Sequence, residues 1–230
     1  KVAANSFLAT KISFINAMAE LCERTGADVT LLADAIGLDD RIGRKFLNAG
    51  LGFGGGCLPK DIRAFMARAG ELGADQTLSF LAEVDAINTR RRVRTVDLAR
   101  EELGGSLLGR KVTVLGAAFK PNSDDIRDSP ALNVAEQIRL QGATVTVTDP
   151  AALNSARAAY PNLLYVEDLH EALKGAEIVL LLTEWSQLVE LDPEQVGELV
   201  SKRVLVDGRN VLEPSKWRAA GWQYRALGRH

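Results

Sequence analysis

Apolar residues recur at three- and four-residue steps through the first hundred positions, which is the spacing of helices with one buried face. The pattern predicts helices over residues 7–22, 30–36, 42–47 and 61–72. Gly26 is placed to end the first of these, and Gly37 the second. A long helix is predicted over about residues 78–103. Its basic run, residues 90–94, is typical of a solvated helix face, and a helix of this length is also suited to a dimer interface.

The pattern changes after Gly104 and Gly105. Apolar or alternating stretches now predict strands over residues 111–115, 144–148, 178–182 and 204–206, with helices over 130–140 and 168–173. Alternating strands and helices indicate a parallel sheet with helices on both faces. We therefore expect an α/β protein with two units: an all-helical domain over 1–104, including the connecting helix, and a Rossmann-like domain over 105–230.

Composition excludes several classes of protein. The net charge of −2 argues against a general nucleic-acid binder, and no apolar run reaches the ~20 residues of a membrane span. The two cysteines, Cys22 and Cys57, lie in dissimilar contexts, so a disulfide framework is not expected and a reducing, cytoplasmic compartment is. His170 and His230 have no ligand-type neighbours at metal-binding intervals, so no metal site is predicted.

The stretch with the most chemical content is residues 52–61, Gly-Phe-Gly-Gly-Gly-Cys-Leu-Pro-Lys-Asp. Glycines let a backbone pass close to a ligand, and a nearby ammonium favours the thiolate of Cys57. Asp61 is suited to orienting water or moving a proton. The combination indicates a covalent-catalysis loop, although a glycine-rich loop with a buried cysteine is also a common structural feature.

In the second unit, ligand-binding residues are expected beyond the carboxyl ends of the strands, where Phe119, Lys120 and Arg209 lie. The first strand, however, runs into Gly-Ala-Ala-Phe at residues 116–119. This turn lacks the second and third glycines of the dinucleotide fingerprint. The second unit is therefore not expected to bind NAD.

Several ordered stretches resemble the UDP-glucose/GDP-mannose dehydrogenase family: residues 1–9, 11–16, 25–28, 36–39, 41–43, 46–47, 52–61, 115–120 and 207–210. The resemblance covers almost the whole chain. It implies the central dimerising domain and the nucleotide-sugar domain of that family, without the N-terminal domain that carries the main NAD site. The chain departs from the common pattern in having Gly56 before the cysteine, Ala17 in the first helix and Asn48 after the third predicted helix.

The family oxidises a sugar C6 alcohol to a carboxylate in two NAD-dependent steps. The resemblance implies that Cys57 forms a thiohemiacetal and then a thioester with the sugar. Lys1 and Asn5 match residues that stabilise an oxyanion, and Asp61 matches the aspartate that assists water or proton transfer. Lys1 and Asn5 are four positions apart, so one helical face presents both.

For the substrate, the resemblance implies that the backbone around Gly52, Phe53, Gly54 and Gly55 cradles the sugar phosphates. Phe46, Phe119, Lys120 and Arg209 match positions around the nucleotide. Arg41 matches an arginine that reaches the substrate from the partner subunit of a homodimer. Arg127 resembles an arginine near the cofactor phosphates.

The segment over residues 36–43 together with Gly-Phe-Gly-Gly is more similar to the UDP-glucose branch of the family than to the others. Thymine and uracil differ by one methyl group, so TDP-glucose stays an alternative substrate, as do GDP-mannose and UDP-N-acetyl sugars. The alternative from a different class is a non-catalytic module that dimerises and binds a nucleotide sugar. A chain without the NAD domain is itself expected to be inactive as a dehydrogenase.

Overall fold

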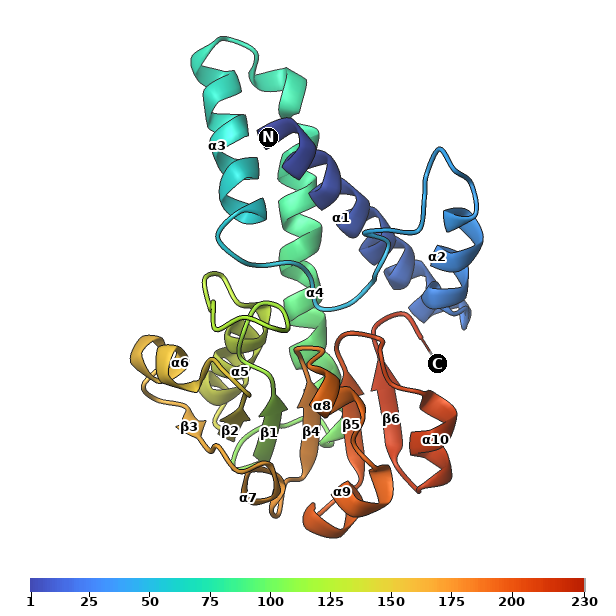
Figure 1. Ribbon diagram of the computed structural model, residues 1–230, viewed down its shortest axis with the longest axis vertical. Helices are drawn as coiled ribbons and strands as arrows, with labels where there is room; N and C mark the ends of the chain where they lie inside the picture. The colour runs from blue at the N-terminus through green and yellow to red at the C-terminus, as the bar shows by residue number, and fades with distance from the viewer. Residues whose placement is uncertain (230) are drawn as a thin grey trace.

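The computed structural model describes residues 1–229. Its first part is helical and consists of α1 (Val2–Thr25), α2 (Val29–Gly37), α3 (Leu58–Glu71), a 3₁₀ turn (Asp75–Leu78) and α4 (Phe80–Glu102) (Figure 1). Gly26, at φ 75°, ends α1, and its N–H donates to the Cys22 carbonyl. The Asp28 carboxylate accepts from the Thr30 N–H and caps α2. Helices α1, α3 and α4 pack around a small core of Ala9, Ile62, Leu81 and Val84.

The second part is a six-stranded, all-parallel sheet in the order β3-β2-β1-β4-β5-β6. The strands are β1 (Lys111–Leu115), β2 (Thr144–Thr148), β3 (Leu164–Tyr165), β4 (Ile178–Leu181), β5 (Val204–Asp207) and β6 (Gln223–Ala226). This is the strand order of dinucleotide-binding folds. The connecting helices are α5 (Pro130–Leu140), α6 (Leu153–Ala159), α7 (Leu169–Leu173), α8 (Ser186–Val189), α9 (Pro193–Leu199) and α10 (Pro214–Ala219). The expected helical region followed by a Rossmann-like sheet is confirmed.

Helix α4 joins the two parts (Figure 1). Its first turns contribute Leu81 and Val84 to the helical core. Its last turns contribute Val96 and Ala99 to the core of the sheet, and its C-cap residue contributes Leu103. Because one continuous helix is buried in both cores, the ends of the sheet strands are held against the loop that precedes α3.

The predicted helix over residues 42–47 is wrong. The segment is an irregular turn in which Gly43 and Phe46 have φ of 67°, a left-handed conformation that ends any right-handed helix. The Arg44 guanidinium fixes the turn by donating to the Leu47 carbonyl and the Asn48 side chain. Smaller differences concern α3, which begins at Leu58, and α4, which begins at Phe80 after the 3₁₀ turn. Strands β3 and β6 and helices α6, α8, α9 and α10 were not predicted.

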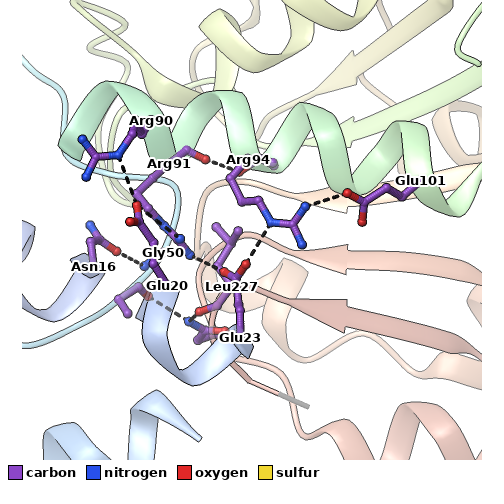
Figure 2. A network of polar contacts seen from close by, with 12 residues as sticks. Asn16, Glu20, Glu23, Gly50, Arg90, Arg91, Arg94, Glu101 and Leu227 are labelled. Atoms are coloured by element: carbon purple, nitrogen blue, oxygen red, sulfur yellow. Dashed lines mark hydrogen bonds and ion pairs between the residues drawn. The ribbon is translucent and has the colours of Figure 1, made fainter. Parts of the chain in front are cut away.

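The interpretation of residues 90–94 as a solvated face is wrong for Arg91 and Arg92. Arg91 is completely buried, and its guanidinium donates to Glu23 of α1 at 2.8 Å. Figure 2 shows Arg94 reaching the same carboxylate from the next turn of α4. Glu20 of α1 lies 3.5 Å from Arg90. Arg90, Arg91 and Arg94 therefore form an ionic contact between α4 and the acidic face of α1, whereas Arg92 pairs with Asp128.

Candidate active site

The glycine loop, residues 50–56, passes so close to its neighbours that a side chain at Gly52 or Gly54 would not fit. A Cβ on Gly54 would lie 2.1 Å from the Asp128 carbonyl oxygen, and one on Gly52 would lie 2.4 Å from the Asn88 Oδ1 atom. Gly52 also has φ of 98°. The sequence suggested close approach to a ligand. The structure adds that these two glycines are required by close approach to the protein itself.

A cavity of about 620 Å³ opens between this loop and the carboxyl ends of the strands, a volume typical of small-molecule sites. It brings together residues far apart in the sequence. Of the predicted substrate residues, it is lined by Phe46, Gly52, Phe53, Gly54, Phe119, Lys120 and Arg209. Lys45, Glu184 and Asn210 line the same cavity and were not predicted.

Arg209 connects the walls of this cavity. Its guanidinium donates to the carbonyls of Leu182, Gly52 and Phe119 at 2.8, 3.2 and 3.4 Å, and Glu184 lies 3.2 Å from its Nε atom. Burial lowers the pKa of Arg209, which the carboxylates of Glu184 and Asp207 partly oppose. Because these bonds tie the glycine loop to the ends of β1 and β4, Arg209 shapes the cavity in addition to giving it positive charge.

Four predicted catalytic residues lie at the start of α1 and α3. Cys57 is exposed and is the N-cap residue of α3. One turn later, the buried Asp61 carboxylate accepts from the Asn5 amide at 2.7 Å and lies 3.2 Å from the Lys1 ammonium. The Asn5 hydrogen bond and the Lys1 contact lower the pKa of Asp61. The Lys1–Asn5–Asp61 cluster is therefore an ammonium, an amide and a carboxylate held together beside the turn that carries the thiol.

Arg41, Arg127 and Gly55 lie outside the cavity. Arg41 is highly exposed, pairs with Asp39 at 2.6 Å and borders a separate hollow with Phe7, Lys11 and Phe14. Arg127 pairs with Asp125 at 2.7 Å. Together with Gly55, Lys60 and Arg63, it borders a third hollow on the α3 side of the loop.

The turn after β1 does not fit a dinucleotide. The N–H groups of Ala117 and Ala118, which would face a pyrophosphate, both donate to Asp149 at 2.6 and 3.0 Å. The Trp185 indole donates to the same carboxylate at 3.1 Å. Because Asp149 already occupies the position of a bound anion, the residues of this turn do not fit the NAD diphosphate.

Sequence reasoning missed the residues that hold the glycine loop: Asn88 and Arg92 of α4, and Asp128. Asn88 and Arg92 are four positions apart, so a shared helix face was foreseeable. Their partner, the main chain of Phe53, was not.

Among residues 1–229 no group of three or more metal-ligating side chains is assembled, and no helix is long and apolar enough to cross a membrane.

Two family models match the chain. The UDP-glucose/GDP-mannose dehydrogenase family, central domain, matches residues 1–90, and the UDP binding domain of the same family matches residues 113–214. The chain is 43% identical over 230 residues to UDP-glucose 6-dehydrogenase TuaD of Bacillus subtilis, covering 100% of this chain and 49% of that protein.

Solved structures give the same picture. A UDP-glucose dehydrogenase from the archaeon Pyrobaculum islandicum matches with a TM-score of 0.87 and 42% identity, over 100% of this chain and 50% of that one. An NDP-N-acetyl-D-galactosaminuronic acid dehydrogenase from Methanosarcina mazei matches with a TM-score of 0.85 and 30% identity, over 100% and 50%. The chain spans about half the length of the relatives it matches.

Proposed function

The chain belongs to the UDP-glucose/GDP-mannose dehydrogenase family, and from that premise we propose that it carries the central and nucleotide-sugar-binding parts of a NAD-dependent UDP-glucose 6-dehydrogenase. One observation carries the proposal. Cys57 stands at the end of the glycine loop that lines the cavity, and one helical turn before Asp61 with its Asn5 and Lys1 partners. Gly54 and Leu58 both line the cavity, and they lie three residues before and one residue after the thiol of Cys57.

In this proposal the nucleotide sugar occupies the cavity. Phe46 and Phe119 offer rings to the base or ribose, while Lys45 and Lys120 bring positive charge to the diphosphate. The backbone of Gly52 to Gly54 faces the same space, so that the sugar extends along the loop toward Cys57. The UDP-glucose relatives at 43% and 42% identity support the choice of sugar.

Cys57 then holds the aldehyde formed by the first oxidation. Its thiolate forms a C–S bond to C6, and the carbonyl oxygen becomes an oxyanion. Lys1 and Asn5 are placed to stabilise that oxyanion, and one such donor is typically worth about 3 kcal/mol of barrier. After the second oxidation the sugar is held as a thioester, and attack by water releases the carboxylate and the thiolate.

Asn5 and Lys1 lower the pKa of Asp61 further below its ordinary acidic value. A carboxylate of lowered pKa is a weak general base. Its contacts therefore favour a role in orienting Lys1, Asn5 and the attacking water over a role as the main proton acceptor.

NAD, when bound, accepts the hydride of each oxidation. The turn after β1 does not fit it, because its N–H groups already donate to Asp149. Arg127 and Lys60 border the hollow on the α3 side of the loop, and Arg127 stays our candidate for a cofactor contact.

We also propose a homodimer formed through the helical part. Phe7 and Phe14 of α1 are 67% and 50% exposed and lie beside Arg41, so an apolar surface with a projecting arginine is available to a second copy. Analytical ultracentrifugation of wild type and of F14D tests the proposed dimer. We expect wild type to sediment as a dimer and F14D as a monomer, and a monomeric wild type contradicts the proposal.

The test of function is calorimetric titration of the 230-residue chain with UDP-glucose, and with GDP-mannose, TDP-glucose and a UDP-N-acetyl sugar as controls. Selective binding of UDP-glucose supports the proposal, and selective binding of another sugar replaces the substrate while keeping the family chemistry. Binding without any role for Cys57 in the full-length enzyme favours the non-catalytic module. We expect no NADH formation by residues 1–230 alone, and clear turnover would contradict that expectation.

A further inference from the structure

Three features that are each unfavourable by themselves meet at the glycine loop. Asn88 is a poor helix former in the middle of α4, and its polar side chain is buried, with the residue only 1% exposed. Arg92, one turn later, is also buried and leaves its Nε atom without a partner. Asp128 has φ of 45°, a left-handed conformation that costs a non-glycine residue energy. Such exceptions to local preference are expected where a fold holds a functional part in place.

All three contact the same short piece of main chain. The Asn88 carboxamide accepts from the Phe53 N–H at 2.7 Å and donates to the Phe53 carbonyl at 3.0 Å. Arg92 donates to that carbonyl at 3.1 Å and to the Asp128 carboxylate at 2.9 Å. Asp128 in turn presents its own carbonyl oxygen to Gly54. We name Asn88, Arg92 and Asp128 the loop clamp.

The clamped residue lies between the two halves of the proposed site. Gly52, Phe53 and Gly54 form a wall of the cavity, and Cys57 follows four residues after Phe53. On the other side of the loop, Arg209 donates to the Gly52 carbonyl. A shift at Phe53 therefore moves the cavity wall and the thiol together.

We propose that Asn88 and Arg92 are positioning residues for the proposed reaction: they fix the main chain of Phe53 and thereby set the distance between the nucleotide cavity and Cys57. The proposal rests on the proposed function for its consequence, and on the contacts of the clamp for its mechanism. Neither side chain is among the cavity residues, so both act through the loop and not by touching the nucleotide.

The experiment compares Asn88→Ala with Thr95→Ala in the 230-residue chain. Thr95 is equally buried on α4, but its hydroxyl donates only to the Arg91 carbonyl of its own helix. Amide hydrogen exchange is followed over a peptide containing residues 51–56, and UDP-glucose affinity is measured by calorimetry at a temperature where both variants are folded.

We expect Asn88→Ala to speed amide hydrogen exchange in the loop at least tenfold. We also expect it to lower the affinity for UDP-glucose at least tenfold, which corresponds to about 1.4 kcal/mol. Thr95→Ala should leave both within twofold of wild type. Unchanged loop exchange in Asn88→Ala overturns the clamp. Faster exchange with unchanged affinity overturns the positioning role, because the contacts are then merely structural.

Two further measurements keep the test decisive if Asn88→Ala does not fold. In wild type, the Phe53 amide should be protected to the same degree as interior amides of α4, and exchange at the rate of an open loop overturns the proposal. Arg92 donates to the Phe53 carbonyl and to the Asp128 carboxylate from two different nitrogens. A lysine in its place has a single nitrogen, so Arg92→Lys should raise the exchange rate of the loop and lower the UDP-glucose affinity, but by less than Asn88→Ala. If wild type binds no nucleotide sugar, the proposed function fails, and the exchange data still decide whether the clamp holds the loop.

Discussion

Gly54 and Gly56 give opposite predictions for the same substitution, alanine. Both have φ outside the positive range, so alanine meets no backbone strain at either site. Both also gain the same benefit from a stiffer unfolded chain, about 0.4–1 kcal/mol. The difference between the two variants therefore isolates what the new Cβ touches.

At Gly54 the new Cβ lies 2.1 Å from the Asp128 carbonyl oxygen, where ordinary contact begins at 3.4 Å. The loop and the Asp128 segment must part by about 1.3 Å. Pro130 Cδ lies 2.6 Å from the same Cβ, and Arg92 ties the Asp128 carboxylate to the Phe53 carbonyl of the loop. Overpacking against fixed backbone places the cost at about 3 kcal/mol or more. At Gly56 the nearest atom is the Arg127 Cζ atom at 2.6 Å, the far end of an exposed side chain that can swing away, so the cost is less than about 1 kcal/mol.

The assay is urea denaturation of wild type, G54A and G56A, followed by tryptophan fluorescence. We expect G54A to lose at least about 2 kcal/mol more than G56A, the difference between the two costs above. Equal stabilities of the two variants would refute the reasoning, because the only difference between the sites is then without consequence. A large loss in G56A alone would show that Arg127 is fixed in place.

Three other predictions concern groups elsewhere in the chain. Hydrogen bonds from Lys202, the Lys111 N–H and Arg110 lower the pKa of Glu177 to about 2. The Glu177 carboxylate therefore contributes its full stabilisation above the ordinary pKa of about 4.5 and loses it as the pH falls toward 2. In acid denaturation, the stability advantage of wild type over E177Q should shrink across that pH range. Alkylation followed by mass spectrometry should modify exposed Cys57 before Cys22, because Cys22 is buried and burial raises its thiol pKa; equal rates count against an accessible catalytic thiol. R91A should lower the free energy of unfolding, measured by urea denaturation, by about 3 kcal/mol. This is the low end for a broken buried ion pair, because Arg94 still neutralises Glu23. R91M should recover part of the loss, and a loss below about 1 kcal/mol in R91A would contradict the buried contact.

The sequence was sufficient for elements that one continuous apolar or periodic stretch of residues makes evident. Strand β1, helix α5 and strand β2 were predicted with the bounds that the structure has, because an apolar run or a period of 3.6 residues is a local property. The missed strands β3 and β6 have two and four residues and lie at the edges of the sheet. Their pairing with a neighbour, which the chain alone does not display, makes them strands.

The candidate site divides in the same way. The residue types of Cys57, Asp61, Lys120 and Arg209 and the run of glycines are visible in the sequence, and they predict the chemistry that we propose for the site. The sequence also predicted that Lys1 and Asn5 share a face. That Asp61 is their common partner depends on α1 packing against α3, across a separation of 56 residues from Asn5.

By itself, the sequence determined the two-part α/β plan, the family and the position of the cysteine that we propose as the nucleophile, since composition, periodicity and motif order carry these. Only the tertiary structure decided that residues 42–47 turn instead of coiling, that Arg91 is buried against Glu23, and that Gly54 is required by Asp128. The physical reason is distance along the chain. Steric exclusion and ion pairing act between atoms a few ångströms apart, and in each of these cases except the turn the partner lies more than sixty residues away.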